Sequence, residues 1–145
     1  YWAKPNFIVK RDNILKKISS PDDVKGYVIG QFAKANHSKF VKDNFNLFRF
    51  DIISGGKNLF EQNLKKLIFG RIDAIHTLDE FTLLYEARRL KLDPYVKILF
   101  LPEAPLPFYS VFCKNEKGQM LKEKFDAAMV DAHSGGCPFI FIASM

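Results

Sequence analysis

The stretch from residue 58 to residue 76 constrains the fold most. Between Asn58 and Phe69, apolar residues recur at the spacing of an amphipathic helix. Gly70 follows at the position where many helices end, because glycine adopts the left-handed conformation of a C-terminal cap without steric cost. A short apolar run over residues 72–76 comes directly after it. The pattern predicts a helix that ends at a glycine and leads into a buried strand.

The same alternation extends along most of the chain. Strands are predicted over residues 7–9, 27–32, 47–53, 72–76 and 96–101. Helices are predicted over residues 21–25, 38–43 and 58–69, and a further one begins at a capping box of Thr77 and Glu80. Strands that are apolar on both faces and alternate with helices indicate an α/β fold, a parallel sheet between two helix layers. Such sheets bind ligands at the carboxyl ends of their strands.

The character of the chain changes at Pro102. Three prolines within residues 102–107 favour an extended crossing rather than a helix or a central strand. Beyond them the pattern predicts a strand over 108–112, a helix over 119–130 and a last strand over 139–142. We therefore expect the main internal boundary near residue 102.

The bulk composition is that of a globular domain. The 145 residues, 48% hydrophobic and 26% charged, suffice for one core. No apolar run reaches the roughly eighteen residues that a membrane-spanning helix needs. The chain begins at Tyr1 without an initiator Met or a signal-peptide pattern, which indicates the edge of a longer precursor or a trimmed chain.

The formal net charge of +6 raises the question of a polyanionic partner. The basic residues are scattered, however, and several lie near predicted helix C-termini, where they complement the helix dipole. This distribution indicates a solvated surface and argues against nucleic acid. A basic nucleic-acid-binding module, whose affinity would fall steeply with salt, is kept as a separate alternative.

Cysteine and histidine spacing gives no sign of a metal site. Cys113 and Cys137 form either one disulfide or two free thiols, and their spacing does not decide between them. His37, His76 and His133 share no ligand spacing. His76 ends a buried strand, where a neutral, hydrogen-bonded ring is expected. No nucleophile motif is present, so the sequence predicts no catalytic residue, cofactor or metal.

Four collinear segments together resemble the bacterial extracellular solute-binding protein family 3, which serves amino-acid ABC importers. Residues 20–30 (SPDDVKGYVIG) are similar to the family's entry into its second lobe. Residues 70–74 (GRIDA) match its Gly-Arg-hydrophobic-Asp-Ala signature. Residues 108–114 resemble the strand that crosses back, and residues 120–129 resemble the closing helix. The resemblance implies a type II periplasmic binding fold.

On this resemblance the chain is a C-terminal portion that lacks most of lobe one, or a shortened relative. Residues 1–11 correspond to the end of lobe one and the first hinge strand, residues 12–107 to lobe two, and residues 108–145 to the return hinge strand and the C-terminal part of lobe one. The crossing strands are expected over residues 5–9 and 108–112. A homodimer formed through the incomplete lobe is a further alternative.

The function implied is that of a periplasmic solute-binding component of an ABC importer. Such a protein is exported, holds a small polar solute (an amino acid or an organic anion) by hinge closure, presents its closed form to an ABC permease, and is no enzyme. Two alternatives share the fold. One is an extracellular ligand-sensing domain of a signalling receptor, and the other is a catalytic relative similar to cyclohexadienyl dehydratase.

The resemblance also points to candidate ligand-binding residues, although this chain departs from the family pattern at both places. The family's Gly-Ser/Thr-Ser/Thr turn corresponds to residues 34–36, so Asn36 and Ser38 are the candidate anion donors, with helix capping as the alternative. The family's ammonium-binding aspartate falls one residue before Asp79, which becomes the candidate together with Thr77. The alternative for Asp79 is an acid in the first turn of a helix.

Overall fold

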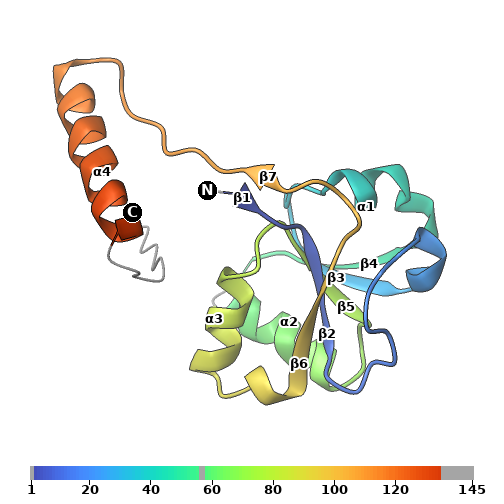
Figure 1. The fold of residues 1–145 in the computed structure, drawn as a ribbon. Helices are drawn as coiled ribbons and strands as arrows, with labels where there is room; N and C mark the ends of the chain where they lie inside the picture. Colours follow the sequence, from blue (N-terminus) through green and yellow to red (C-terminus); the bar gives the residue numbers. More distant parts are fainter. Residues whose placement is uncertain (1, 56–57, 135–145) are drawn as a thin grey trace. The chain divides into compact units, whose positions relative to one another are not determined.

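The chain forms two compact units in the computed structural model, which describes residues 2–55 and 58–134. Residues up to Phe108 form the first unit, and residues from Tyr109 onward form the second. The first unit is a mixed α/β domain, and the second is built around one long helix (Figure 1). The α/β fold class predicted from the sequence is confirmed.

The strands and helices of the first unit alternate largely as predicted. Its strands are β1 (Trp2–Ala3), β2 (Asn6–Lys10), β3 (Val28–Phe32), β4 (Arg49–Ile53), β5 (Ala74–Thr77), β6 (Val96–Phe100) and β7 (Leu106–Pro107). Its α-helices are α1 (Lys39–Asp43), α2 (Leu59–Ile68) and α3 (Thr82–Arg89). Short 3-10 turns lie at η1 (Pro21–Val24), η2 (Phe45–Leu47) and η3 (Asp93–Tyr95).

Five strands form the central sheet in the order β4-β3-β5-β2-β6. Strand β3 runs parallel to β4 and β5, as the alternation predicts. Strand β2 runs antiparallel to both of its neighbours, β5 and β6, so the expectation of a wholly parallel sheet is wrong. A strand that is apolar on both faces has the same sequence pattern in either direction. Its direction is set by the path of the connecting chain.

The sheet has one hydrophobic cluster on each face, and β2 shows how the pleat divides them. Phe7 and Val9 belong to the cluster beneath α1, whereas Ile8 between them belongs to the cluster beneath α2 and α3. Successive strand side chains point to opposite faces, which explains this alternation. Figure 1 shows α2 and α3 together on one side of the sheet and α1 on the other.

Helix α2 ends at the predicted glycine. Gly70 has φ +70°, its N–H donates to the Leu67 carbonyl, and the Arg71 N–H donates to the Lys66 carbonyl. These two bonds form a Schellman motif. The helix also lies close to the sheet. A Cβ atom on Gly30 of β3 would lie 2.9 Å from Asn63 Oδ1 of α2 and 2.5 Å from Ile72 Cδ1, so both side chains would have to shift to admit a larger residue there.

Asp73, from the Gly-Arg-hydrophobic-Asp-Ala signature, fixes the register between β3 and β5. Its Oδ2 accepts a hydrogen bond from the Val28 N–H at 2.8 Å, and its own N–H donates to the Val28 carbonyl at 2.8 Å. This reciprocal contact extends the parallel pairing of Ile29 with Ala74 by one residue. The aspartate of the signature therefore has a structural role.

We expect Asp73→Ala to lower the free energy of unfolding by about 1–2 kcal/mol, because it leaves the Val28 N–H without its charged acceptor. Urea unfolding of the full chain measures this change. The exposed Asp22 on η1 provides a matched control, since Asp22→Ala is expected to change stability by no more than about 0.5 kcal/mol. Equal losses in the two variants would contradict the role of Asp73 in the register.

Strands β1 and β7 pair outside the five-stranded sheet. They are antiparallel, with Trp2 opposite Pro107 and Ala3 opposite Leu106. The predicted crossing strand over residues 5–9 is instead mostly β2, because its apolar side chains are buried on both faces of the sheet. Residues 108–112 form no strand, since an apolar run needs a partner ladder as well as side chains that favour extension. The assignment of residues 1–11, 12–107 and 108–145 to two lobes stays a prediction.

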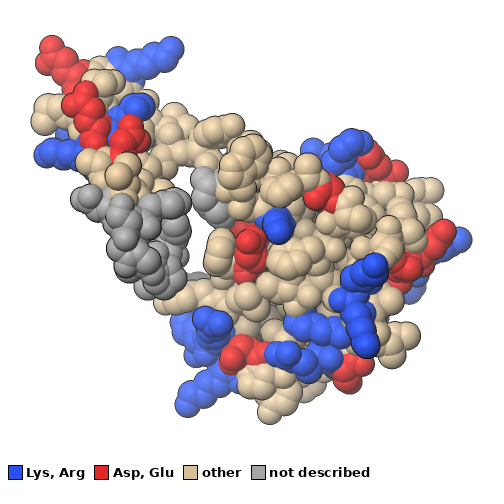
Figure 2. Space-filling view, viewed as in Figure 1, with Lys and Arg blue, Asp and Glu red and all other residues tan. Residues whose placement is uncertain are grey.

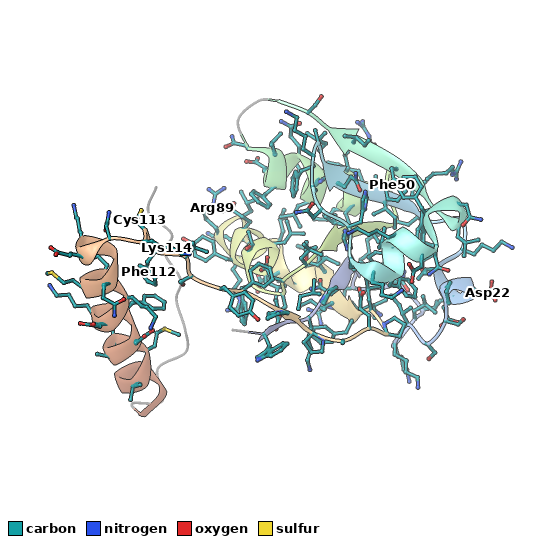
Figure 3. All side chains as sticks on the ribbon, turned by 90° about the horizontal axis from the view of Figure 1, so that it is seen from above. Asp22, Phe50, Arg89, Phe112, Cys113 and Lys114 are labelled. Atoms are coloured by element: carbon teal, nitrogen blue, oxygen red, sulfur yellow. The ribbon has the colours of Figure 1, made fainter. Side chains whose placement is uncertain are left out.

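The second unit consists of a short extended segment and helix α4 (Glu116–Ser134), which includes the predicted helix. Phe112, labelled in Figure 3, belongs to the extended segment, and its ring centroid lies 5.7 Å from that of Phe125. Cys113 is exposed. Cys137 and the predicted strand over residues 139–142 lie outside the described residues. Across residues 2–55 and 58–134, no helix combines the length and apolar character needed to cross a bilayer.

Basic side chains of the first unit are interspersed with acidic ones. Figure 2 shows Lys and Arg beside Asp and Glu over the visible face. Among the described residues of this unit, five ion pairs join them within and between elements: Lys10–Asp12, Lys39–Asp43, Lys65–Glu61, Lys66–Asp51 and Arg89–Glu86. Exposed pairs of this kind contribute little to stability. They do, however, place a negative charge beside each of these lysine and arginine side chains.

Candidate functional site

The four residues predicted from the sequence lie in two loops at the same edge of the sheet. Asn36 and Ser38 follow β3, whereas Thr77 ends β5 and Asp79 lies just beyond it. Because β3 and β5 are parallel neighbours, their carboxyl ends meet at this edge. The fold therefore places both loops where α/β sheets bind ligands.

The first loop leaves Asn36 exposed and buries Ser38. The Ser38 side chain is only 1% exposed and caps α1, with its hydroxyl oxygen 3.5 Å from the Val41 nitrogen that donates to it. Its capping role was the alternative interpretation, and the geometry confirms that contact. Of this pair, only Asn36 presents its side chain freely to solvent.

The second loop is organised by Asp79. Its Oδ1 accepts hydrogen bonds from the N–H groups of Phe81 and Thr82 at 2.9 and 2.7 Å, and its Oδ2 accepts one from the Thr82 hydroxyl. The predicted capping box of Thr77 and Glu80 is wrong. Asp79 takes over the cap because it lies closer to the first free amides of α3, and the Glu80 carboxylate instead accepts from the N–H of Lys4.

Thr77 faces the α3 side of the sheet. Its hydroxyl donates to the Asp79 carbonyl at 2.5 Å and also lies 3.2 Å from Asn6 Oδ1. The Asn6 side chain is fully buried and donates through Nδ2 to the Lys4 carbonyl. Thr77 thus holds the end of β5 against the start of β2. Both Thr77 and Asp79 are partly exposed to solvent.

The structure also brings together two histidines that the sequence did not connect. The rings of His37 and His76 are stacked, with centroids 6.0 Å apart and planes 19° apart. The His76 ring also meets the edge of Phe7 at 6.0 Å. His76 was predicted to be hydrogen-bonded, but its buried Nε2 has no partner among the described residues. The nearest sequence signal was the position of His37 directly before the helix cap Ser38.

Burial keeps both imidazoles neutral. Removal from water and, to a smaller extent, the nearby His37 together lower the pKa of His76 to about 4. Burial also lowers the pKa of His37, with a smaller contribution from the positive charge of Lys42. At neutral pH each ring can therefore donate one hydrogen bond and accept another.

Aromatic rings surround the histidine pair on the α1 face. Phe45 and Phe50 are stacked with centroids 4.5 Å apart, and each meets the His37 ring at an interplanar angle above 60°. Phe50 extends from β4, where Figure 3 labels it. Among residues 2–55 and 58–134, no three His, Cys, Asp or Glu side chains gather in a way that could hold a metal ion.

Comparison with known proteins places the fold. No protein-family model and no curated protein matches the chain. An ancestral arginine-binding protein bound to glutamine has a TM-score of 0.60 and 23% identity, over 94% of this chain and 56% of that one. The amino acid ABC transporter substrate-binding protein AbpA from Streptococcus pneumoniae, bound to L-arginine, has a TM-score of 0.64 and 21% identity, over 94% and 54%.

Two further solved structures show the breadth of the likeness. The probable amino-acid ABC transporter extracellular-binding protein ytmK from Bacillus subtilis has a TM-score of 0.63 and 21% identity, over 93% of this chain and 56% of that one. The periplasmic VFT2 domain of Bordetella pertussis BvgS has a TM-score of 0.51 and 10% identity, over 72% and 42%. The chain has the type II periplasmic binding fold of amino acid ABC transporter substrate-binding proteins, and it spans a little over half the length of those it resembles.

Proposed function

We propose that this chain supplies one half of the ligand cleft of an amino-acid-type solute-binding protein. The observation that carries the proposal is structural: the likeness to such proteins extends over 94% of the chain. The carboxyl edge of its parallel strands, where this fold class binds ligands, carries the loops with Asn36 and Asp79. The solute is a small polar molecule, an amino acid or an organic anion.

The proposed mechanism is hinge closure. A solute held at the carboxyl edge would also contact a partner lobe, and those bridging contacts form only in the closed state, so the solute favours closure. Strands β1 and β7 support this role, because two segments far apart in the sequence pair side by side there, as the connecting segments of a hinge would. Connectors of this kind absorb the backbone rotation of a hinge.

The wider role follows from the same likeness. We propose an exported, periplasmic protein that delivers its solute to an ABC permease and performs no chemistry on it. The ancestral arginine-binding protein and AbpA each cover 94% of this chain, and they hold glutamine and L-arginine respectively. The BvgS domain covers less of the chain at lower identity, so a sensor role receives less support.

An NMR titration of the ¹⁵N-labelled chain with L-arginine and, separately, L-glutamine tests this proposal. Backbone amide signals of residues 33–38 and 78–82 are expected to shift and saturate. The dissociation constant should be on the order of 1 mM, a binding free energy of about −4 kcal/mol, because one half of a cleft makes only part of the contacts. Shifts spread evenly over the surface, or none at all, would contradict a site at this edge.

Two asparagine variants test whether Asn36 contacts the solute. Asn36→Ala is expected to weaken binding by about threefold to tenfold, a loss of roughly 1 kcal/mol for one exposed hydrogen bond. Asn46→Ala changes an equally exposed asparagine on η2 and should leave the affinity unchanged. If both variants bind as tightly as the unmodified chain, Asn36 does not contact the solute.

A further inference from the structure

Strand β4 forms an open edge of the five-stranded sheet. It comes first in the strand order, and within residues 2–55 and 58–134 it pairs with β3 alone. Figure 3, in which Phe50 is labelled, shows β4 along the outside of the first unit. The free side of an edge strand presents backbone N–H and C=O groups that can pair with a strand of another chain. The edge of β4 is therefore a candidate interaction surface.

The hydrogen bonds to β3 show which residues of β4 face outward. The Arg49 N–H donates to the Tyr27 carbonyl, and the Ile53 carbonyl accepts from the Ala33 N–H. Backbone groups alternate in direction along a strand, so the residues at odd positions from 49 to 53 point toward β3. Those of Phe50 and Ile52 point to the open side.

Phe48 lengthens this outward row. Its backbone is already extended, with φ −110° and ψ 157°. Its N–H donates to the Phe45 carbonyl at 3.3 Å, so its outward contribution is the carbonyl oxygen. A strand that pairs with this edge therefore finds donors and acceptors over residues 48–52.

The side chains of the edge are apolar on one face. Phe48 and Phe50 belong to the cluster on the α1 face, and Ile52 points to the same face because it lies two residues further along the strand. The Ile52 side chain is nevertheless 57% exposed. A neighbouring strand would cover it.

The opposite face of the edge carries two charges of opposite sign. Asp51 accepts from Lys66 Nζ of α2 at 2.5 Å, so Asp51 and the neighbouring alternate residue Arg49 lie on the α2 face. Arg49 is exposed and forms no ion pair with the residues that the structure describes. Charges on an edge strand oppose any pairing that brings like charges together.

A second copy of the chain can satisfy both faces at once. Two copies of β4 can pair antiparallel about a two-fold axis, since each then offers the same groups to the other. With Phe50 on the axis, its N–H and C=O bond reciprocally to those of Phe50 in the second copy. The Ile52 N–H then meets the Phe48 carbonyl, and the Ile52 side chain is covered by Phe48 of the second copy.

The charges select this register among those that the backbone allows. With Phe50 on the axis, Arg49 of each copy lies opposite Asp51 of the other, in a pair whose side chains lie close together. With Asp51 on the axis, two aspartates would face each other, and with Arg49 on the axis two arginines would. Like charges directly opposite each other destabilise a sheet. An axis at Ile52 would place Asp51 opposite the uncharged Ile53.

We propose that β4 is a homodimer interface, in which two copies of this chain pair antiparallel with Phe50 on the two-fold axis. The pairing gives Arg49 a carboxylate partner and covers the exposed Ile52. It leaves the candidate ligand site open, because that site lies at the ends of the strands whereas β4 pairs along its side. The inference does not depend on the proposed function.

Sedimentation equilibrium of the full chain tests the interface. A reducing buffer is used, because the exposed Cys113 could otherwise cross-link two chains. Pairing over so short an edge is expected to give a reversible dimer with a dissociation constant between about 10 µM and about 1 mM. A chain that stays monomeric up to about 1 mM would leave this edge to another partner or to none, and would overturn the proposal.

Two variants test the register. Arg49→Asp places an aspartate opposite Asp51 of the second copy, so dimerisation should weaken at least about tenfold. Asp51→Asn removes the attraction to Arg49 but keeps an oxygen for Lys66, and it should weaken the dimer about threefold to tenfold. Arg88→Asp makes the same charge change as Arg49→Asp at an exposed position on α3 and should leave the dimer unchanged.

The variants also distinguish this register from its competitors. With Asp51 on the axis, Asp51→Asn would remove a repulsion and strengthen the dimer, and Arg49→Asp would have little effect. Circular dichroism verifies that each variant is folded. A folded Arg49→Asp chain that dimerises as tightly as Arg88→Asp, or an Asp51→Asn chain that dimerises more tightly than the unmodified chain, would overturn the proposal.

Discussion

Acidification from pH 7 to about pH 4 is expected to lower the free energy of unfolding by roughly 3 kcal/mol through His76 alone. Burial of this ring lowers its pKa in the folded chain to about 4, from an ordinary value of 6.5. Between these two values the unfolded chain binds more protons than the folded chain does. Protonation therefore favours the unfolded state, and the stability present above pH 6.5 is lost as the pH falls toward 4.

The charges that act on the two histidines, His37 and Lys42, work in the same direction. His37 stacks on His76, and a proton on either ring repels a proton on the other. Lys42 adds positive charge near His37.

Urea unfolding at a series of pH values measures this effect. His76→Phe keeps a ring beside Phe7 and cannot titrate, so the difference between the two chains isolates the contribution of His76 from that of the carboxylates. The variant should lose about 3 kcal/mol less stability than the unmodified chain over the same range. His37→Phe, at the less buried ring, should have a smaller effect. Parallel stability curves for the unmodified chain and His76→Phe would contradict the burial of a neutral imidazole.

Phe7→Ala is expected to lower the free energy of unfolding by about 3–5 kcal/mol, because it opens a large cavity in the middle of the sheet. Phe7 is fully buried in β2, between β5 and β6. Its ring forms edge contacts with Phe48 at 5.9 Å and with His76 at 6.0 Å. Both contacts disappear with the ring, so the variant also loosens the packing around the histidine pair.

The midpoint of a urea titration at neutral pH checks this prediction. Ile14 provides the control, since its side chain is 93% exposed and Ile14→Ala is expected to change stability by less than about 0.5 kcal/mol. If the free energy of unfolding of Phe7→Ala lies within about 1 kcal/mol of that of the unmodified chain, β2 is not packed between both helix layers.

The sequence determined the local elements because their signals are local. The helical spacing of apolar residues predicted α2, and Gly70 predicted where it ends. The alternation of strands and helices predicted the α/β class and the carboxyl edge as the place of the candidate site. The resemblance of four short segments predicted a fold that the structural comparison confirmed.

The details of capping were less predictable from spacing alone. Thr77 and Glu80 match a capping box, yet Asp79 binds the free amides of α3. Several polar side chains near a helix start can reach these amides, and the path of the preceding strand decides which one does. Ser38 likewise uses its side chain to cap a helix, α1.

Only the tertiary structure decided the direction of β2 and the meeting of His37 with His76. A fully buried strand carries no mark of its direction, so the antiparallel pairing of β2 came from the path of the chain. The two histidines meet because β3 and β5 are neighbours and α1 covers their ends. Periodicity describes which face a residue occupies, whereas contact between distant residues depends on the strand order. Likewise, only the folded structure shows that Gln31 Oε1 and Glu103 Oε1 are buried without a hydrogen-bond partner.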